Sequence, residues 1–226
     1  MELNTYPLVC TRGVVLYPNQ EIVIDVGRDT SVHAVENAQD NYDKKICLFS
    51  QKELEQENPE KEDIYPVGTL CEVRHIRRFD NFLRVKFRGI KRVKLNNWIN
   101  GSLSDLAEVE ILESEKQDAV KEEALIRMIA DELDRMQGQD RFVTKEIVME
   151  ISKGMGGEFL SDKAVQGLPL DIERKQQYLE TLGVNDRLMM LLQDMAKEKK
   201  MSEVEQQINE TVKERIDQGQ KDYYLR

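Results

Sequence analysis

Short β-branched or apolar runs separated by turn residues follow one another through the first half of the chain, and in places hydrophobic and polar positions alternate with a period of two, as in short β-strands. The alternation is clearest over residues 83–88, where three apolar side chains alternate with three basic ones, so one face of this strand is expected to be buried. Asp80 and Asn81 precede it and favour a hairpin turn from a strand at residues 70–76. The first part of the chain is therefore predicted to be rich in β-structure.

Further elements of this part are predicted from β-branched runs and turn residues. Strands are expected at residues 21–26, 45–49, 93–99 and 103–112, a short helix at about 29–39 capped by Asp29, and an exposed polar loop at 51–63. Gly89 predicts a bulge or a sharp bend within the β-structure. Short strands, sharp bends and one small helix together indicate a strongly bent sheet or pseudo-barrel.

The second part of the chain repeats apolar residues at helical spacing between glycines and prolines. Helices are expected at residues 116–137, 144–152, 159–166, 171–183 and 185–219, with a flexible break at 154–157 and Asp171 as an N-cap. The first helix is expected to bury one face made of Leu125, Met128, Ile129, Leu133 and Met136. The whole pattern predicts an α+β protein, in which a strongly bent β-sheet or pseudo-barrel precedes a set of helices and a long C-terminal helix.

The last of these helices has a polar middle, because Lys197-Glu198-Lys199-Lys200 interrupts its apolar stripe. The part before this segment is expected to pack on the preceding helices. The part after it carries a separate narrow stripe at three- and four-residue spacing, formed by Met201, Val204, Ile208, Val212 and Ile216. This arrangement is typical of a connector or a coiled-coil arm, and the alternative is a frayed amphipathic tail.

Composition sharpens this division of the chain. The sequence has 33 Lys and Arg against 43 Asp and Glu, a net charge of −10, and it is 34% charged but only 6% aromatic. Prolines and aromatic residues concentrate before a boundary near 112–118 and methionines after it, which predicts domains at 1–114, 115–184 and 185–226. The acidic balance argues against a general nucleic-acid or anionic-membrane binder.

Candidate chemistry is sparse. The phosphate-loop pattern GxxxxGK[ST] and the esterase pattern GxSxG are absent, and two histidines and three cysteines without CxxC spacing favour no metal site. Cys71 and His75 would lie about 13 Å apart on one strand, too far for a catalytic pair. No catalytic, cofactor-binding or metal residue is predicted. With neither a leader nor a membrane span expected, and with reduced thiols, a cytoplasmic protein is expected.

Nine basic residues between Arg74 and Lys94 are opposed by Asp80 alone, and phenylalanines are interleaved among them. Such a surface is compatible with RNA binding, in which cations neutralise phosphates and rings stack on bases. The alternative is a solvated strand face that meets acidic segments of the same or another chain, and this interpretation is favoured.

Two sets of apolar side chains are candidate partner contacts. Phe79 and Phe82 flank the predicted hairpin tip and are hypothesised to contact hydrophobic segments of partners, unless they pack under the loop at 51–63. Met189, Met190 and Met195 have flexible side chains suited to varied partners, although methionine at helical spacing is also typical of a plain core.

Six short motifs follow one another along nearly the whole chain: YPLVCTRGVVLYP (residues 6–18), VGRDTS with AVENA (26–38), YPVGT (65–69), FRGIKR (87–92), LPL with KQ and LETL (168–182), and QKDYYLR (220–226). Taken together they resemble the N-terminal substrate-binding region of the Lon family of ATP-dependent proteases. Cys10, Thr11 and Arg88 depart from that family's usual residues, and Arg88 makes the hairpin more basic.

The resemblance implies a bent, PUA-like β-domain followed by an α-helical bundle domain and a long helix that enters an AAA+ ring. It implies a region that captures exposed, unstructured segments of damaged proteins, helps to assemble a hexamer and passes substrates to an ATP-driven unfoldase. It implies that ATP and Mg²⁺ bind only to an AAA+ module beyond residue 226, where a Ser-Lys peptidase module is also expected. These residues themselves would perform no chemistry. Two alternatives stay open, a free-standing adaptor that ends at Arg226 and an RNA-binding PUA-like module.

Overall fold

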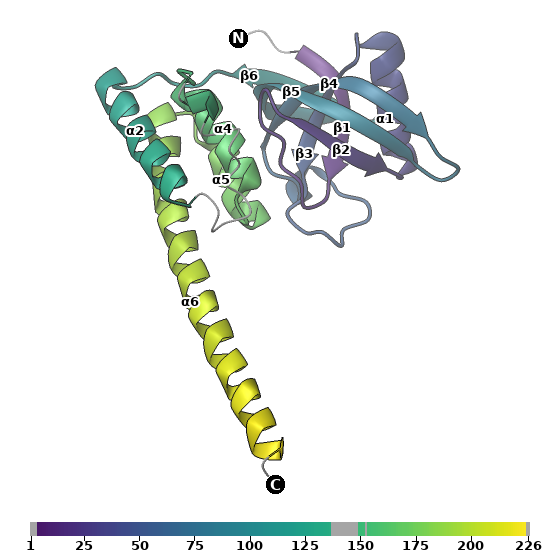
Figure 1. Cartoon of the computed structure of the whole chain (residues 1–226). Coiled ribbons are helices and arrows are strands. Elements are labelled where there is room, and N and C mark those ends of the chain that lie inside the picture. Colours follow the sequence, from purple (N-terminus) through teal and green to yellow (C-terminus); the bar gives the residue numbers. More distant parts are fainter. Residues whose placement is uncertain (1–3, 137–148, 152, 225–226) are drawn as a thin grey trace.

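The computed structural model describes residues 4–136, 149–151 and 153–224. Its β-part contains β1 (Asn4–Thr11), β2 (Glu21–Val26), α1 (Asp29–Asn41), β3 (Lys45–Ser50), the 3₁₀ turn η1 (Lys61–Asp63), β4 (Val67–Arg78), β5 (Leu83–Ile99) and β6 (Leu106–Leu112). Its helical part contains α2 (Ala119–Met136), α4 (Gly157–Gly167), α5 (Ile172–Glu180) and α6 (Val184–Tyr224). The predicted α+β class with a long final helix is confirmed (Figure 1).

The six strands form one mixed sheet in the order β2-β5-β4-β3-β1-β6. β1 and β3 are parallel, and the other neighbouring pairs are antiparallel. The long strand β5 also pairs with β6, and this closes the sheet on itself along one end. The predicted alternation on β5 is confirmed, because Leu83, Val85 and Phe87 are buried in the core that also receives α1.

Gly89 lies at a β-bulge rather than at the end of a strand. The pairing of β4 with β5 shifts there, so that Leu70 faces Lys91 while Cys71 faces Gly89. A Cβ atom on Gly89 would lie 2.2 Å from the carbonyl oxygen of Tyr17. A glycine is therefore needed because the chain before β2 crosses β5 at this point.

Several predicted boundaries are wrong in detail. α1 has Arg28 at its N-cap with no side-chain cap bond, so Asp29 lies in the first turn and is not the cap. β6 begins at Leu106 rather than at residue 103. α6 continues through Gly219 to Tyr224, because one glycine inside a helix lowers stability without ending it. Asp171 caps α5 as predicted, since its Oδ1 accepts from the backbone N–H of Arg174 at 2.7 Å.

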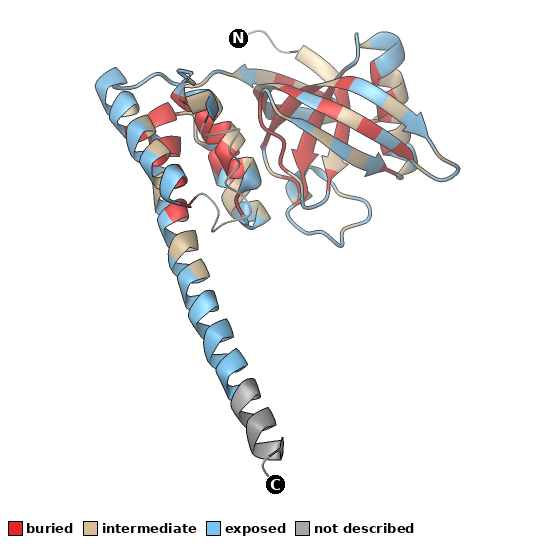
Figure 2. Cartoon of the chain, in the orientation of Figure 1, coloured by how far each residue is buried: buried red, intermediate tan, exposed pale blue. Residues whose placement is uncertain are grey.

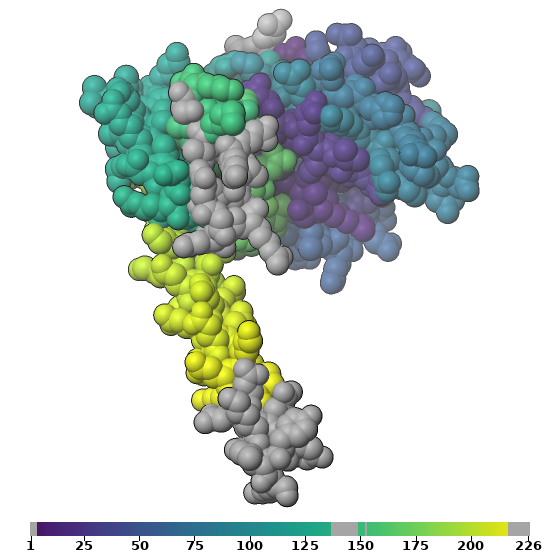
Figure 3. Space-filling view, in the orientation of Figure 1, coloured from purple at the N-terminus to yellow at the C-terminus, as the bar shows by residue number. Residues whose placement is uncertain are grey.

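The helical part packs directly against the β-part (Figure 3). Its core is formed by α2, α4, α5 and the first half of α6, and Val15, Tyr17 and Val67 of the β-part belong to the same hydrophobic cluster. The hydroxyl of Tyr17 donates to the carbonyl of Lys175 at 2.7 Å. Gly138 and most of the helix expected at 144–152 lie outside the described residues.

The two halves of α6 differ in burial (Figure 2). Leu188 and Leu191 are fully buried against α2 and α4, whereas the helix projects from the molecule after its polar middle. On α2, the predicted buried face is wrong at one position. Leu125, Ile129, Leu133 and Met136 are buried as expected, but the side chain of Met128 is 57% exposed.

Candidate functional site

The tip of the β4–β5 hairpin carries two stacked aromatic rings. Phe79 and Phe82 have ring centroids 4.7 Å apart and planes inclined by 12°, and both residues remain half-buried. The guanidinium groups of Arg77 and Arg84 lie 5.0 and 5.3 Å from the Phe79 centroid. The hairpin thus holds the two rings together at a surface position.

The basic side chains beside this tip are largely neutralised by carboxylates of the same chain. Arg84 donates two 2.7 Å hydrogen bonds to Asp25, and Lys86 lies 2.6 Å from a Glu21 oxygen. These bonds hold the pKa of Asp25 and that of Glu21 below their ordinary values. The favoured interpretation of the basic stretch, a strand face that meets acidic segments of the same chain, is confirmed for these residues.

Arg92 corrects the prediction for this stretch. The basic stretch predicts a solvated Arg92, but its side chain is only 2% exposed and donates two hydrogen bonds, of 2.9 and 2.5 Å, to the carboxylate of Asp162 on α4. Its Nε also donates to the carbonyl of Leu179 at 3.1 Å. The face of β5 that was predicted to be solvated is here covered by α4 and α5.

A second buried guanidinium completes this junction. Arg187 of α6 lies 3.8 Å from Asp162 and donates to the hydroxyls of Ser161 and Ser114 and to the carbonyl of Thr181. Burial, and then the charge of Arg92, lower the pKa of Arg187 to about 10. One carboxylate thus joins an arginine of the sheet to an arginine of the long helix. No periodicity signals this cluster, because its three charged members come from distant segments.

The three candidate methionines of α6 have different environments. Met195 is 1% exposed inside the helical core, so its assignment as a partner contact is wrong and the plain-core interpretation holds. Met190 is half-buried against the same core, and its sulfur accepts from the hydroxyl of Thr181 at 3.7 Å. Met189 is 38% exposed. Of the three, Met189 alone has a largely accessible side chain.

The stripe on the projecting half of α6 is accessible throughout. Its five apolar members are between 48% and 55% exposed: Met201, Val204, Ile208, Val212 and Ile216. Their spacing places them along one side of a helix that leaves the rest of the molecule (Figure 2). This stripe is a candidate seam for self-association.

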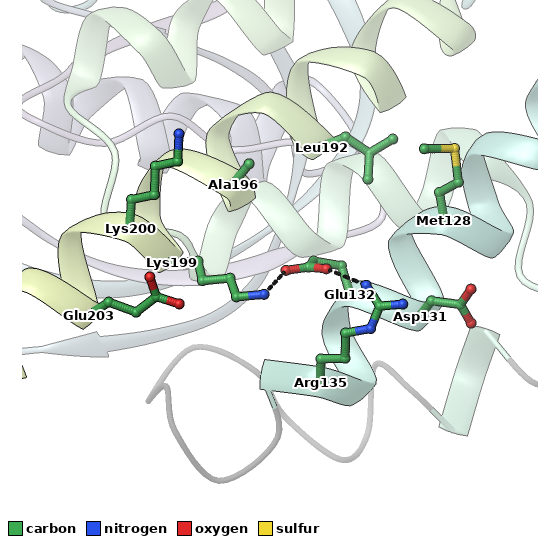
Figure 4. Close-up of a pocket in the computed structure, with 9 residues that line it drawn as sticks. All are labelled: Met128, Asp131, Glu132, Arg135, Leu192, Ala196, Lys199, Lys200 and Glu203. Carbon is green, nitrogen blue, oxygen red and sulfur yellow. Dashed lines mark hydrogen bonds and ion pairs between the residues drawn. The ribbon is translucent and has the colours of Figure 1, made fainter.

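A groove of about 590 Å³ lies where α2 faces α6 (Figure 4). Met128, Leu192 and Ala196 supply its apolar lining, which explains why Met128 is not in the core. Glu132 crosses the groove to Lys199 at 3.0 Å, and this hydrogen bond lowers the pKa of Glu132. No sequence pattern predicts this groove, because it arises only where two helices pack.

Nucleophiles and metal ligands are not gathered in the part of the chain that the structure describes. Cys10, Cys47 and Cys71 are free thiols, and burial raises the pKa of Cys10 to about 12. Cys71 is fully buried whereas His75 is exposed. No group of three or more histidine, cysteine or acidic residues able to hold a metal occurs among these residues. None of the described helices is both long and apolar enough to cross a membrane.

Comparison with known proteins decides the family. The sequence model described as the ATP-dependent protease La (LON) substrate-binding domain matches residues 5–197. The chain belongs to the Lon substrate-binding domain family. The match ends at the start of the polar middle of α6, so it does not include the exposed seam.

Curated relatives of this Lon domain are longer than the chain. It is 34% identical over 229 residues to the Lon protease of Syntrophomonas wolfei, covering 100% of this chain and 28% of that protein. It is 29% identical over 224 residues to Lon protease 1 of Bacillus subtilis, covering 99% of this chain and 29% of that protein. The chain thus spans less than a third of the length of these relatives, and the matched stretch corresponds to an N-terminal region.

Solved structures agree on the fold. The N-terminal domain of the Mycobacterium avium complex Lon protease superimposes with a TM-score of 0.69 at 18% identity, covering 85% of this chain and 98% of that one. A Lon N-terminal domain protein from Xanthomonas campestris gives a TM-score of 0.60 at 15% identity, covering 84% of this chain and 97% of that one. The resemblance inferred from the six motifs is therefore confirmed.

Proposed function

We propose that this Lon domain captures exposed, unstructured segments of damaged or misfolded proteins and delivers them to the ATPase and peptidase modules of a longer cytoplasmic protease. The match to the substrate-binding domain over residues 5–197 carries the proposal. ATP and Mg²⁺ would bind to the AAA+ module outside residues 1–226. The neutralised hairpin charges favour this function over RNA binding.

The contact surface proposed for substrates is the Phe79–Phe82 stack, with Met189 as a second accessible apolar side chain. Stacked rings present a flat apolar surface that accepts many different side chains, and weak contacts of this kind suit a domain that must bind many sequences. Substrate affinity should then fall when the rings are removed.

This function is tested with fluorescently labelled β-casein as the unfolded probe. We expect Phe79→Ser with Phe82→Ser to weaken binding about tenfold, the loss expected when about 1.4 kcal/mol of contact energy is removed. Val120→Ser is the matched control, because Val120 is 79% exposed on α2 and also loses apolar surface. Unchanged binding by the double variant would contradict the hairpin as the contact, and no binding by the unmodified chain would contradict the function.

We also propose that the seam on α6 mediates self-association, which in the longer protein would contribute to a hexamer. Apolar residues at three- and four-residue spacing pack against a second helix when both stripes are buried. Ile208→Asp with Val212→Asp should therefore shift the chain to monomer in analytical ultracentrifugation, while Gln207→Asp, outside the stripe, should not. If the unmodified chain, the double variant and Gln207→Asp all sediment alike, the proposal is contradicted.

A further inference from the structure

The strand β2 is the free edge of the sheet. All six of its residues, Glu21–Val26, pair with β5, and within the described residues it pairs with no other strand. β6, at the other end of the strand order, is covered on both sides because it pairs with β1 and with β5. An edge strand presents a row of unpaired N–H and C=O groups, which is a template for another strand.

The register identifies the backbone groups that face outward. The N–H of Gly89 donates to the carbonyl of Gln20 at 2.9 Å, and the pairing of β2 with β5 continues from that point in unbroken register. Residues of an antiparallel strand alternate between bonding to the partner strand and pointing away from it. The N–H and C=O groups of Glu21, Val23 and Asp25 therefore point away from β5, toward the free side.

A groove of about 330 Å³ lies on that free side. It is bounded by residues 9–12, at the end of β1, and by residues 24–28, which are the end of β2 and the link to α1. β6 pairs with β1 only over Asn4–Pro7, so the space between β2 and the second half of β1 is not filled by a strand of the sheet. Val9 and Val26 are buried at the base of the groove, and Ile24 is half-buried in its wall.

The groove also has a positive end. Arg12 donates to the carbonyl of Gln56 at 3.2 Å, and Arg28 donates to the side-chain oxygen of Gln51 at 2.5 Å. Among the described residues neither guanidinium has an ion pair within 4.0 Å, and the charge of Glu57 acts on Arg28 from farther away. Two neighbouring cations that bind only neutral oxygens favour a ligand with a negative charge.

A second copy of β2 fits this edge poorly. In an antiparallel copy centred on Val23, Glu21 would lie opposite Asp25 and Asp25 opposite Glu21, and directly opposed like charges weaken a strand pair, although Lys86 and Arg84 partly offset these carboxylates. A foreign extended segment has no such restriction, because its main chain supplies the hydrogen bonds whatever its side chains are. Val23 is exposed on the face of β2 opposite to the groove, so it would contact the other face of such a segment.

We propose that β2 binds an extended substrate segment as an added strand, with apolar side chains directed into the groove and a carboxylate placed near Arg12 and Arg28. The inference rests on the proposed function and specifies the chemistry of its substrate: an unpaired main chain in β conformation, with apolar residues and one acidic residue on the same face. Main-chain recognition explains how one site accepts many sequences.

The test uses the whole chain and a blocked peptide that alternates threonine with valine and carries one central glutamate on its valine face. At saturation, amide hydrogen exchange of Glu21, Val23 and Asp25 should slow by about tenfold or more, because these N–H groups enter hydrogen bonds. Exchange at Ile22 and Ile24 should not change, because they already bond to β5. The same peptide with lysine in place of glutamate should bind about tenfold more weakly.

A matched pair of variants tests the edge directly. Val23→Pro removes the central outward N–H without taking a hydrogen bond from β5, and edge strands tolerate proline at such positions. It should weaken the binding of both the peptide and unfolded β-casein about tenfold, whereas Val23→Thr, which keeps the N–H, should bind within about twofold of the unmodified chain.

The outcomes separate the two proposals. If β-casein binds but the exchange of Glu21, Val23 and Asp25 is unchanged, strand addition is overturned while the proposed function stands. If β-casein binds to none of the proteins, the proposed function fails and strand addition fails with it. The exchange measurement on the unmodified chain decides the question even if Val23→Pro does not fold.

Discussion

Two arginines on the same strand illustrate how strongly position determines the role of an ion pair. Arg84, near the hairpin tip, and Arg92, at the junction with the helices, each donate two hydrogen bonds to one aspartate. The side chains of Arg84 and Asp25 are 48% and 49% exposed, whereas those of Arg92 and Asp162 are both 2% exposed.

The physical difference lies in solvation. Water screens the hairpin pair and would resolvate either partner if the other were removed, so this pair contributes little to stability. The junction pair has lost its water, and removing one partner leaves an uncompensated buried charge. The junction therefore holds the sheet and the helices in one arrangement, while the hairpin tip can change its contacts at low cost.

The largest expected effect is at the junction. Asp162→Ala leaves the guanidiniums of Arg92 and Arg187 buried without a carboxylate, and it should lower the free energy of unfolding by about 3–5 kcal/mol in urea denaturation. The double variant Arg92→Met with Asp162→Leu removes both charges of the pair and should lose less than Asp162→Ala alone. If Asp162→Ala lowers the free energy of unfolding by less than about 1 kcal/mol, the buried pair at the junction stabilises the fold no more than the exposed pair at the hairpin tip.

The next effect tests the bulge that lies between the two regions. A Cβ atom on Gly89 would lie 2.2 Å from the backbone oxygen of Tyr17, and backbone cannot move aside as a flexible side chain can. Gly89→Ala should therefore lower the free energy of unfolding by about 1–3 kcal/mol, measured in the same way. If Gly89→Ala were as stable as the unmodified chain, the close crossing at the bulge would be wrong.

A smaller effect is expected for the ring stack at the tip. Phe82→Ala removes the partner of Phe79, and a stacked pair of rings contributes about 0.5–1.5 kcal/mol beyond the burial of its area. Thermal unfolding followed by circular dichroism should show a modest fall in Tm, and Phe82→Tyr, which keeps the ring, should not. A loss as large as that of Asp162→Ala would mean that the tip is part of the core.

The smallest effect concerns the pH dependence of the exposed pair. Hydrogen bonds from Arg84 lower the pKa of Asp25 in the folded chain. The pair therefore adds stability above the ordinary aspartate pKa and loses it as the pH falls through the lowered value. Carboxyl-detected NMR should find the pKa of Asp25 below its ordinary value, and Arg84→Met should raise it toward that value. A pKa that does not change in Arg84→Met would contradict the assignment.

Much of the fold is predictable because local rules and burial agree. Leu83, Val85 and Phe87 alternate as a half-buried strand must, and Asp171 caps its helix through an N–H that lies three residues ahead. The exposed seam on α6 could also be predicted from the sequence. Its apolar stripe follows a polar interruption, so it is not expected to pack on the helices that precede it.

The candidate site was harder to predict, because exposure depends on what covers a side chain. Met128 and Met195 both occur at helical spacing, yet one lines the groove and the other fills the core. The groove beside β2 depends on where β6 stops along β1, which is a matter of strand pairing and not of composition.

The amino-acid sequence by itself determined the elements, their order, the division into a β-part and a helical part, and the family to which the chain belongs. These follow from short-range periodicity, turn chemistry and motifs that adjacent residues carry. Only the tertiary structure decided that Arg92 is buried, that Met195 is inaccessible and that β2 is a free edge. Each of these depends on contacts between segments that are distant in sequence. Such contacts remove water from Arg92 and leave Arg84 hydrated, so two arginines of β5 have different roles.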